Sequence, residues 1–140
     1  MLLRGINLGP SRRVRMQSLR DLLESEGYGN VRTYVQSGNV VLDSSLRPAL
    51  LEAALEQQLA AGLGFDVDVF VRTPSELEAV LARDPLGSEA ADRSRYLVTF
   101  LREPLDPRRA AQLAAADFAP ERLAVNGRVD HFRGVVRRSA

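Results

Sequence analysis

One run of residues, 32–43, constrains the fold of this chain more than any other stretch. It reads Arg-Thr-Tyr-Val-Gln-Ser-Gly-Asn-Val-Val-Leu-Asp. As far as residue 36, apolar and polar side chains alternate with the two-residue period of a half-buried strand. Gly38 and Asn39 then offer the positive φ that a two-residue type II′ turn needs at its first position. The run therefore predicts a β-hairpin whose second strand returns through residues 40–42.

The segments on either side of this hairpin alternate between strand and helix patterns. A strand is predicted at 2–6, a helix from Met16 that Gly27 ends, a second helix from Pro48 that Gly62 and Gly64 end, and a strand at 67–71. Strand, helix, two strands, helix and strand is the order of a ferredoxin-like unit.

The second half repeats this pattern in part. We predict a helix that starts at Thr73-Pro74-Ser75-Glu76 and a strand at 96–101. A further helix is predicted to start at Asp106-Pro107 and to end at Pro120, and Asn126-Gly127 is predicted to form the turn of a second hairpin. We therefore predict one compact globular α+β protein. It comprises a ferredoxin-like unit at 1–72, a linking helix and loop at 73–94, and an incomplete second ferredoxin-like βαββ unit at 95–140.

The second unit is incomplete because residues 133–140 are too few for a further helix and strand. Three explanations stay open: the unit lacks these elements, another chain supplies them, or the gene model is cut short. An open sheet edge would allow the protein to form a homodimer.

Composition limits the classes of function. The chain has 140 residues, no cysteine and a single histidine, His131, which has no partner motif for catalysis. No apolar run is long enough to span a membrane and no signal peptide is visible, so we expect a cytoplasmic protein. No motif indicates a cofactor, a metal site or a catalytic residue.

Charge is unevenly distributed, although the net charge is only +1. Residues 1–20 contain five arginines and no acid. In a ferredoxin-like unit the end of the first strand, the 7–15 loop, the first helix N-terminus, the 36–39 turn and the 62–66 turn share one end of the sheet. This places eight polar residues as candidate ligand-binding residues: Arg4, Asn7, Arg12, Arg13, Arg15, Gln36, Ser37 and Asn39.

Two interpretations of this cluster stay open. A helix N-terminus beside arginines favours a small ligand that bears phosphate or carboxylate, or backbone contact with nucleic acid. Alternatively, the loop is solvated, its amides satisfy the backbone, and Arg4 pairs with Asp43 or another acid. An enzyme that uses carboxylates on a small anionic metabolite, and a structural protein that dimerises through its sheet edge, are the rival functions.

Three motifs carry a resemblance to a known family. Leu2-Leu-Arg-Gly-Ile-Asn-Leu-Gly9, Met16-Gln-Ser-Leu-Arg-Asp-Leu-Leu23 and the run from Asn30 to Val41 resemble the bacterial family of unknown function designated DUF1697. Segments 69–73 and 97–101 also match. The resemblance implies a double ferredoxin-like architecture and no particular activity. Family members usually continue past the second hairpin, so this chain is expected to be a shortened or frame-altered member.

Overall fold

The computed structural model describes residues 1–140 except 8, 10–11, 88–95, 121, 127–128 and 134–140. The chain divides into two units, Met1–Thr73 and Pro74–Ala140. The fold is mixed α+β with four helices and two antiparallel sheets in the described residues. Residues 88–94 of the predicted linking loop, Gly127 of the predicted second turn and Arg128 of the strand predicted after it lie outside these residues.

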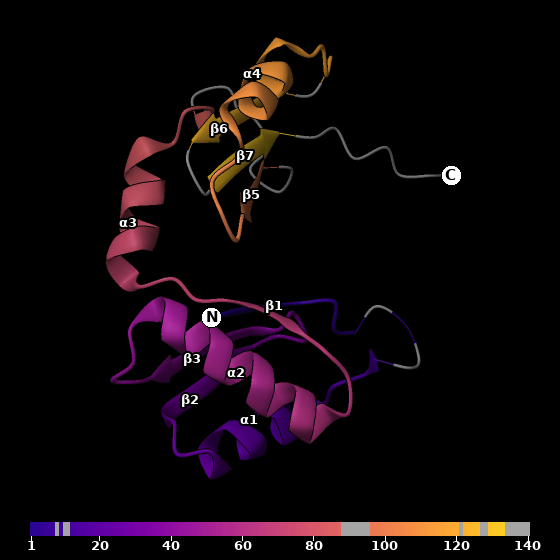
Figure 1. Cartoon of the computed structure of the whole chain (residues 1–140), viewed down its shortest axis with the longest axis vertical. Helices are drawn as coiled ribbons and strands as arrows, with labels where there is room; N and C mark the ends of the chain where they lie inside the picture. Colours follow the sequence, from indigo (N-terminus) through magenta and orange to yellow (C-terminus); the bar gives the residue numbers. More distant parts are fainter. Residues whose placement is uncertain (8, 10–11, 88–95, 121, 127–128, 134–140) are drawn as a thin grey trace. The chain divides into compact units, whose positions relative to one another are not determined.

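Unit 1 contains a four-stranded antiparallel sheet with two helices on one face (Figure 1). Its elements are β1 (Leu2–Arg4), α1 (Met16–Ser25), β2 (Gly29–Tyr34), β3 (Asn39–Asp43), α2 (Pro48–Leu63) and β4 (Asp68–Phe70). The strand order is β2-β3-β1-β4, so β1 lies between β3 and β4. The order of elements matches the prediction.

The core of unit 1 lies between the two helices and the sheet. Its fully buried side chains are Leu19, Leu23, Leu55, Leu59 and Val69. The helical spacing of the leucines turns one stripe of each helix towards the sheet, where their burial provides the main driving force for folding. The predicted end of α1 is confirmed, since Gly27 follows it with φ 90°. Gly64, with φ 78°, ends α2 as predicted, whereas Gly62, which was also expected to end it, lies inside the helix.

The outer edge of β4 is covered by carboxylates of α2 instead of by another strand. Glu56 Oε1 accepts the Val69 N–H at 3.0 Å, and Glu52 Oε1 accepts the Val71 N–H at 2.8 Å. Glu52 is buried and forms an ion pair of 3.3 Å with Arg72. These bonds satisfy backbone donors that would otherwise attract a further strand.

The turn of the first hairpin differs from the prediction. Tyr34 pairs with Asn39, so the loop is the four residues 35–38, and the expected two-residue turn at Gly38-Asn39 is wrong. Val35 is not a strand residue: it has φ 53° and is 68% exposed. The register follows from the packing of Gly38 on β1, a tertiary contact that the local turn pattern does not contain.

Unit 2 contains α3 (Pro74–Arg83), β5 (Tyr96–Phe100), α4 (Pro107–Ala115), β6 (Arg122–Asn126) and β7 (Val129–Arg133). The described strands form an antiparallel sheet in the order β5-β7-β6, and α4 contacts β6. As predicted, a helix starts at Asp106-Pro107, and Asp106 caps α4 by accepting the N–H groups of Arg108 and Arg109. The helix ends at Ala115, earlier than the expected stop at Pro120.

Candidate functional site

The loop after β1 is fastened to the hairpin turn by Asn7. The Asn7 Oδ1 accepts the Val14 N–H at 2.8 Å, and its Nδ2 donates to the Gln36 carbonyl at 3.3 Å. The Asn7 N–H donates to the Arg12 carbonyl at 2.8 Å. Asn7 has φ 57°, a left-handed conformation that asparagine tolerates better than most residues. The expected proximity of loop and turn is thus confirmed.

Gly38 packs the turn directly onto β1. Its carbonyl accepts the Leu3 N–H at 3.0 Å. A Cβ built on Gly38 would lie 2.9 Å from Ile6 Cδ1 and 3.2 Å from the Leu3 carbonyl oxygen, and the φ of Gly38 is 74°. Only glycine meets both the steric and the backbone requirement at this position.

Ser37 and Asn39 take part in hydrogen bonds within the turn. The Ser37 Oγ donates to the Tyr34 carbonyl at 2.5 Å and accepts the Asn39 N–H at 3.4 Å. Asn39 belongs to β3, where it pairs with Tyr34 on one side and Leu2 on the other. Ser37 therefore has a structural role in the turn.

Arg12 is held over the aromatic ring of Phe65. Its guanidinium carbon lies 5.5 Å from the ring centroid, a cation–π geometry. On the other side, its Nη1 lies 3.5 Å from the position that a Cβ on Gly5 would occupy. Phe65 follows α2, so the expected position of the 62–66 turn at this end of the sheet is confirmed.

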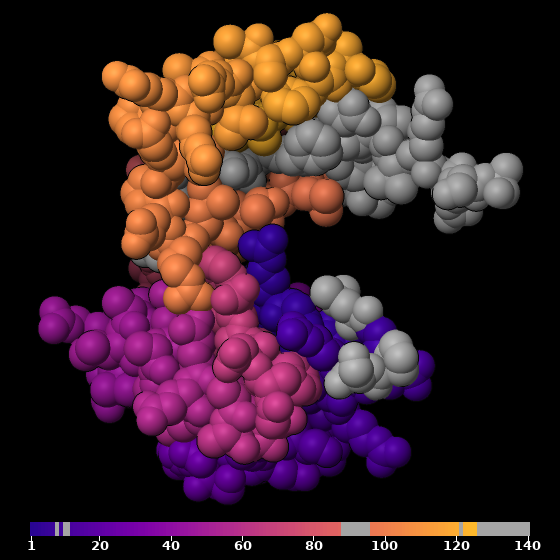
Figure 2. All heavy atoms as spheres, turned by 45° about the vertical axis from the view of Figure 1, so that its right-hand side comes forward, coloured from indigo at the N-terminus to yellow at the C-terminus, as the bar shows by residue number. Residues whose placement is uncertain are grey.

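The N-terminus of α1 opens beside this loop. Arg15 is its N-cap residue, and no side chain of the described residues caps the helix. The first turn contains no acid, and Arg12, Arg13 and Arg15 are exposed. In the space-filling view the N-terminal segment lies at the surface of unit 1 (Figure 2). The uncapped start of α1 is thus directly preceded in the sequence by three exposed arginines.

Two other N-terminal arginines have acids or hydroxyls opposite them. Arg20 donates through Nη1 to Thr33 Oγ1 and through Nη2 to Gln17 Oε1, which fixes α1 to β2. Arg4 is exposed and lies directly across from Asp68 in the β1–β4 register. Of the five N-terminal arginines, the three that precede α1 therefore remain as candidates for ligand binding.

The groups with a shifted pKa lie outside this cluster. Burial lowers the pKa of the Met1 amino group, which donates to the Val40 carbonyl. Burial also raises the pKa of Tyr28, whose Oη donates to Gln58. Burial, together with Asp84, raises the pKa of Tyr96 to about 12.

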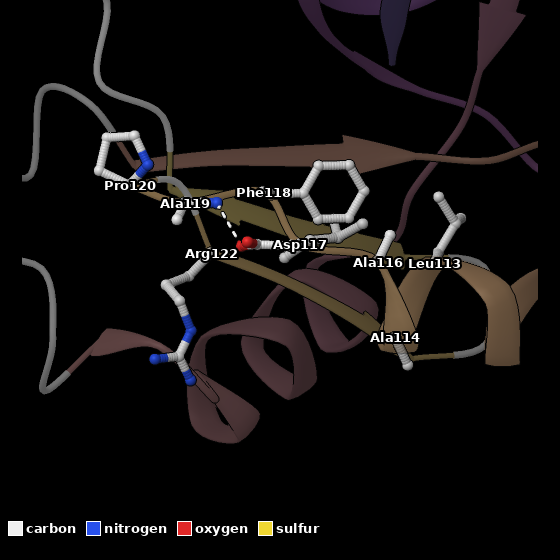
Figure 3. Close-up of a pocket in the computed structure, with 9 residues that line it drawn as sticks. Leu113, Ala114, Ala116, Asp117, Phe118, Ala119, Pro120 and Arg122 are labelled. Atoms are coloured by element: carbon white, nitrogen blue, oxygen red, sulfur yellow. Dashed lines mark hydrogen bonds between the residues drawn. The ribbon is translucent and has the colours of Figure 1, made fainter.

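A pocket in unit 2 has a volume of about 430 Å³ and lies between the end of α4 and β6 (Figure 3). Asp117 is its one carboxylate, and its Oδ1 accepts the Ala119 N–H at 2.9 Å. The Arg122 side chain extends away from the Phe118 ring (Figure 3). Paired acids, which the enzyme interpretation requires, are absent from the lining of this pocket.

Neither a metal centre nor a membrane span is visible in the part of the chain that the structure describes. No group of three or more histidine, cysteine, aspartate or glutamate residues is placed to hold a metal ion among those residues. No described helix has both the length and the apolar character needed to cross a bilayer.

Sequence reasoning missed three parts of the site. Gly5 and Phe65 flank the Arg12 guanidinium, and the Val14 N–H is the donor that anchors the Asn7 amide. The position of Phe65 in the 62–66 turn was the available signal, because the topology already places that turn beside the loop.

Comparison with known proteins gives a family and a similar solved structure. The family model described as "Protein of unknown function (DUF1697)" matches residues 1–130. A conserved bacterial protein, SP0830 from Streptococcus pneumoniae, has a solved structure that is similar to this chain with a TM-score of 0.73. The two are 29% identical, and the match covers 94% of this chain and 72% of that one. The search of curated proteins gave no match.

Proposed function

Because this chain belongs to the DUF1697 family, for which no function is described, we propose its function from the site itself. We propose that it is a binding module for a small ligand bearing phosphate or carboxylate, held at the N-terminus of α1. We also infer that unit 1 is ferredoxin-like and that unit 2 is a partial copy. The strand orders β2-β3-β1-β4 and β5-β7-β6 support this assignment.

One observation carries the proposal: the start of α1 has neither a side-chain cap nor an acid in its first turn. The first N–H groups of a helix have no partner within the helix and carry partial positive charge. At α4 the same groups are occupied by Asp106. At α1 the nearest charged side chains in sequence are exposed arginines, so an anion would complete the helix.

The start of α2 offers a matched contrast. Its N-cap residue, Arg47, also lacks a side-chain cap, but Pro48 at the first helical position has no N–H to donate. Arg47 is a single basic residue there, whereas α1 is preceded by three. This difference makes Arg47 a control for the general effect of a positive charge at a helix start.

The neighbouring contacts restrict the ligand chemistry. The Arg12 guanidinium lies over Phe65, which reduces the conformational entropy that it would lose on binding. A guanidinium presents two parallel N–H donors, a geometry that matches the oxygens of phosphate or carboxylate. The amide of Asn7 is already engaged with Val14 and Gln36. Ligand contacts therefore centre on Arg12, Arg13 and Arg15, while Asn7 holds the loop in place.

An NMR titration tests the proposal. Inorganic phosphate, a nucleotide and a short oligonucleotide are added separately to the 15N-labelled protein. We expect saturable amide shifts at residues 12–18 and 36–39. The variant Arg13→Gln with Arg15→Gln should weaken affinity roughly a hundredfold or more, since hydrogen bonds to charged groups contribute about 1.5–3 kcal/mol each and two are lost.

Arg47→Gln is the control and should leave affinity unchanged. Shifts that avoid both residue ranges, or an equal loss of affinity in the control, would refute the proposal. If the oligonucleotide alone binds, with a steep dependence on salt, the partner is a nucleic-acid backbone instead of a small ligand.

A further inference from the structure

The hairpin of β2 and β3 carries four side chains on the face of the sheet that α1 and α2 leave uncovered (Figure 1). Val40 is buried in the core with the leucines of both helices. Side chains alternate along a strand, so its neighbours Asn39 and Val41 lie on the opposite face. Asn39 pairs with Tyr34, and Val41 pairs with Arg32. These two cross-strand pairs therefore form one patch, which we call the hairpin patch.

The hairpin patch is exposed and its polar groups are not used within the protein. Tyr34 is 73% exposed and Val41 is 67% exposed. Arg32 is also exposed, and Asn39 is half-buried. Among the described residues, neither the Arg32 guanidinium nor the Asn39 side-chain amide has a hydrogen-bond or ion-pair partner. An aromatic ring, a cation and an amide are thus available side by side.

The one acid near this patch in β3 has a partner of its own. Asp43 lies two residues beyond Val41 on the same face of the strand. Its Oδ2 accepts a hydrogen bond of 2.5 Å from Asn30 Nδ2. Since Asp43 is held by Asn30, the Arg32 guanidinium is left to attract an anion.

Each of the three groups fits a different part of a nucleotide. A tyrosine ring stacks on the flat face of any base. An asparagine amide offers a donor and an acceptor that match the edge of a base. Cross-strand partners have Cβ atoms about 4.5–5.5 Å apart, so the Asn39 amide lies beside the Tyr34 ring. Arg32 lies two residues along β2, roughly 6.6–6.8 Å away, where its side chain can reach the adjoining phosphate.

We propose that the hairpin patch binds single-stranded nucleic acid, with one base stacked on Tyr34 and the adjoining phosphate paired with Arg32. Small ligands bind in concave sites that bury most of their surface. The Tyr34 ring is instead presented on an exposed sheet face, which suits a strand that lies along it. In a duplex the faces of the bases are already stacked, so a duplex cannot use the ring. The patch is separate from the α1 start, because all four residues belong to β2 and β3.

Fluorescence anisotropy of a short labelled single-stranded oligonucleotide measures the affinity at low salt. We expect a dissociation constant of roughly 1–100 µM, the range of binding that depends on phosphate contacts without a specific sequence. The duplex of the same sequence and the free mononucleotide should each bind at least about tenfold more weakly, because neither presents both a free base face and a continuous strand.

Variants of the patch separate stacking from charge. Tyr34→Ala should weaken binding roughly 5- to 100-fold, whereas Tyr34→Phe keeps the ring and should bind like the wild type. Arg32→Gln should weaken binding and make its salt dependence less steep. Leu50→Ala is the control, because Leu50 is an exposed apolar residue of α2, on the other face of the sheet. These positions are exposed, so the fold should persist, which circular dichroism checks.

The outcome is read separately from that of the proposed function. The oligonucleotide should shift the amides of residues 32, 34 and 41, whereas inorganic phosphate reports on the start of α1, so either proposal can fail alone. The inference is overturned if no strand binds or if Tyr34→Ala binds as tightly as the wild type. It is equally overturned if Leu50→Ala weakens binding as much as Tyr34→Ala, or if the duplex or the mononucleotide binds as tightly as the strand.

Discussion

Gly38→Ala should destabilise unit 1 more than an ordinary surface substitution does. Gly38 is buried in the hairpin turn with φ 74°. An alanine Cβ there would lie 2.9 Å from Ile6 Cδ1 and 3.2 Å from both the Leu3 Cβ and the Leu3 carbonyl oxygen. The backbone oxygen cannot move without disturbing β1, so the turn itself would have to shift.

Two costs add at this position. A residue with a Cβ pays about 1–2 kcal/mol in the left-handed region. Forcing a methyl group into a packed site adds roughly 1–3 kcal/mol. We therefore expect Gly38→Ala to lower the free energy of unfolding of unit 1 by about 2–5 kcal/mol.

Gly64→Ala separates the two costs. Gly64 ends α2 with φ 78°, and a Cβ there would have no atom within 4 Å. It should therefore cost only the backbone part, about 1–2 kcal/mol. The difference between the two variants measures how tightly the turn packs on β1.

Urea denaturation followed by hydrogen exchange of the Leu19 and Leu23 amides reports on unit 1 alone, since two units need not unfold together. The same samples should show weaker protection in the 35–38 loop for Gly38→Ala. If Gly38→Ala costs no more than Gly64→Ala, the close contact between turn and β1 does not exist as described.

Two further predictions concern polar side-chain contacts. Glu52→Leu should lower the free energy of unfolding, measured by chemical denaturation, by about 3–5 kcal/mol, because Arg72 loses its buried partner and the Val71 N–H loses its acceptor. Adding Arg72→Leu should recover part of this loss, and no recovery would contradict the ion-pair explanation. Burial and the hydrogen bond to Asp84 raise the pKa of Tyr96 to about 12 from 10.0. The folded state therefore holds this proton more tightly, so its contribution is complete below pH 10.0 and is lost as pH rises towards 12. Stability measured across this range should fall less steeply in Tyr96→Phe, and identical slopes would refute the assignment.

The sequence predicted the order of elements and the end of the sheet at which the loop and turn meet. Those features follow from local periodicity and from the geometry of antiparallel connections. The start of α4 at Asp106-Pro107 was also predicted, because it depends only on neighbouring residues.

The details of the turn were not predictable in the same way. The alternation up to Val35 indicates a strand, yet Val35 has φ 53°, an unfavourable conformation for a β-branched residue. Packing of Gly38 on Leu3 and Ile6 sets the loop at residues 35–38 and overrides the local preference. A similar shift occurs in the second hairpin, where Asn126 pairs with Val129 as a strand residue instead of entering the turn.

The candidate residues divide into those that build the site and those that are left for a ligand. The polar groups of Asn7 and Ser37 are engaged in bonds within the protein, and the Gln36 carbonyl accepts one of them. Arg13 and Arg15 are exposed before a helix that no described side chain caps. Substitution of a building residue should therefore change stability and affinity together, because the loop loses its anchor. Substitution of an exposed arginine should change affinity alone, since surface charges contribute little to folding.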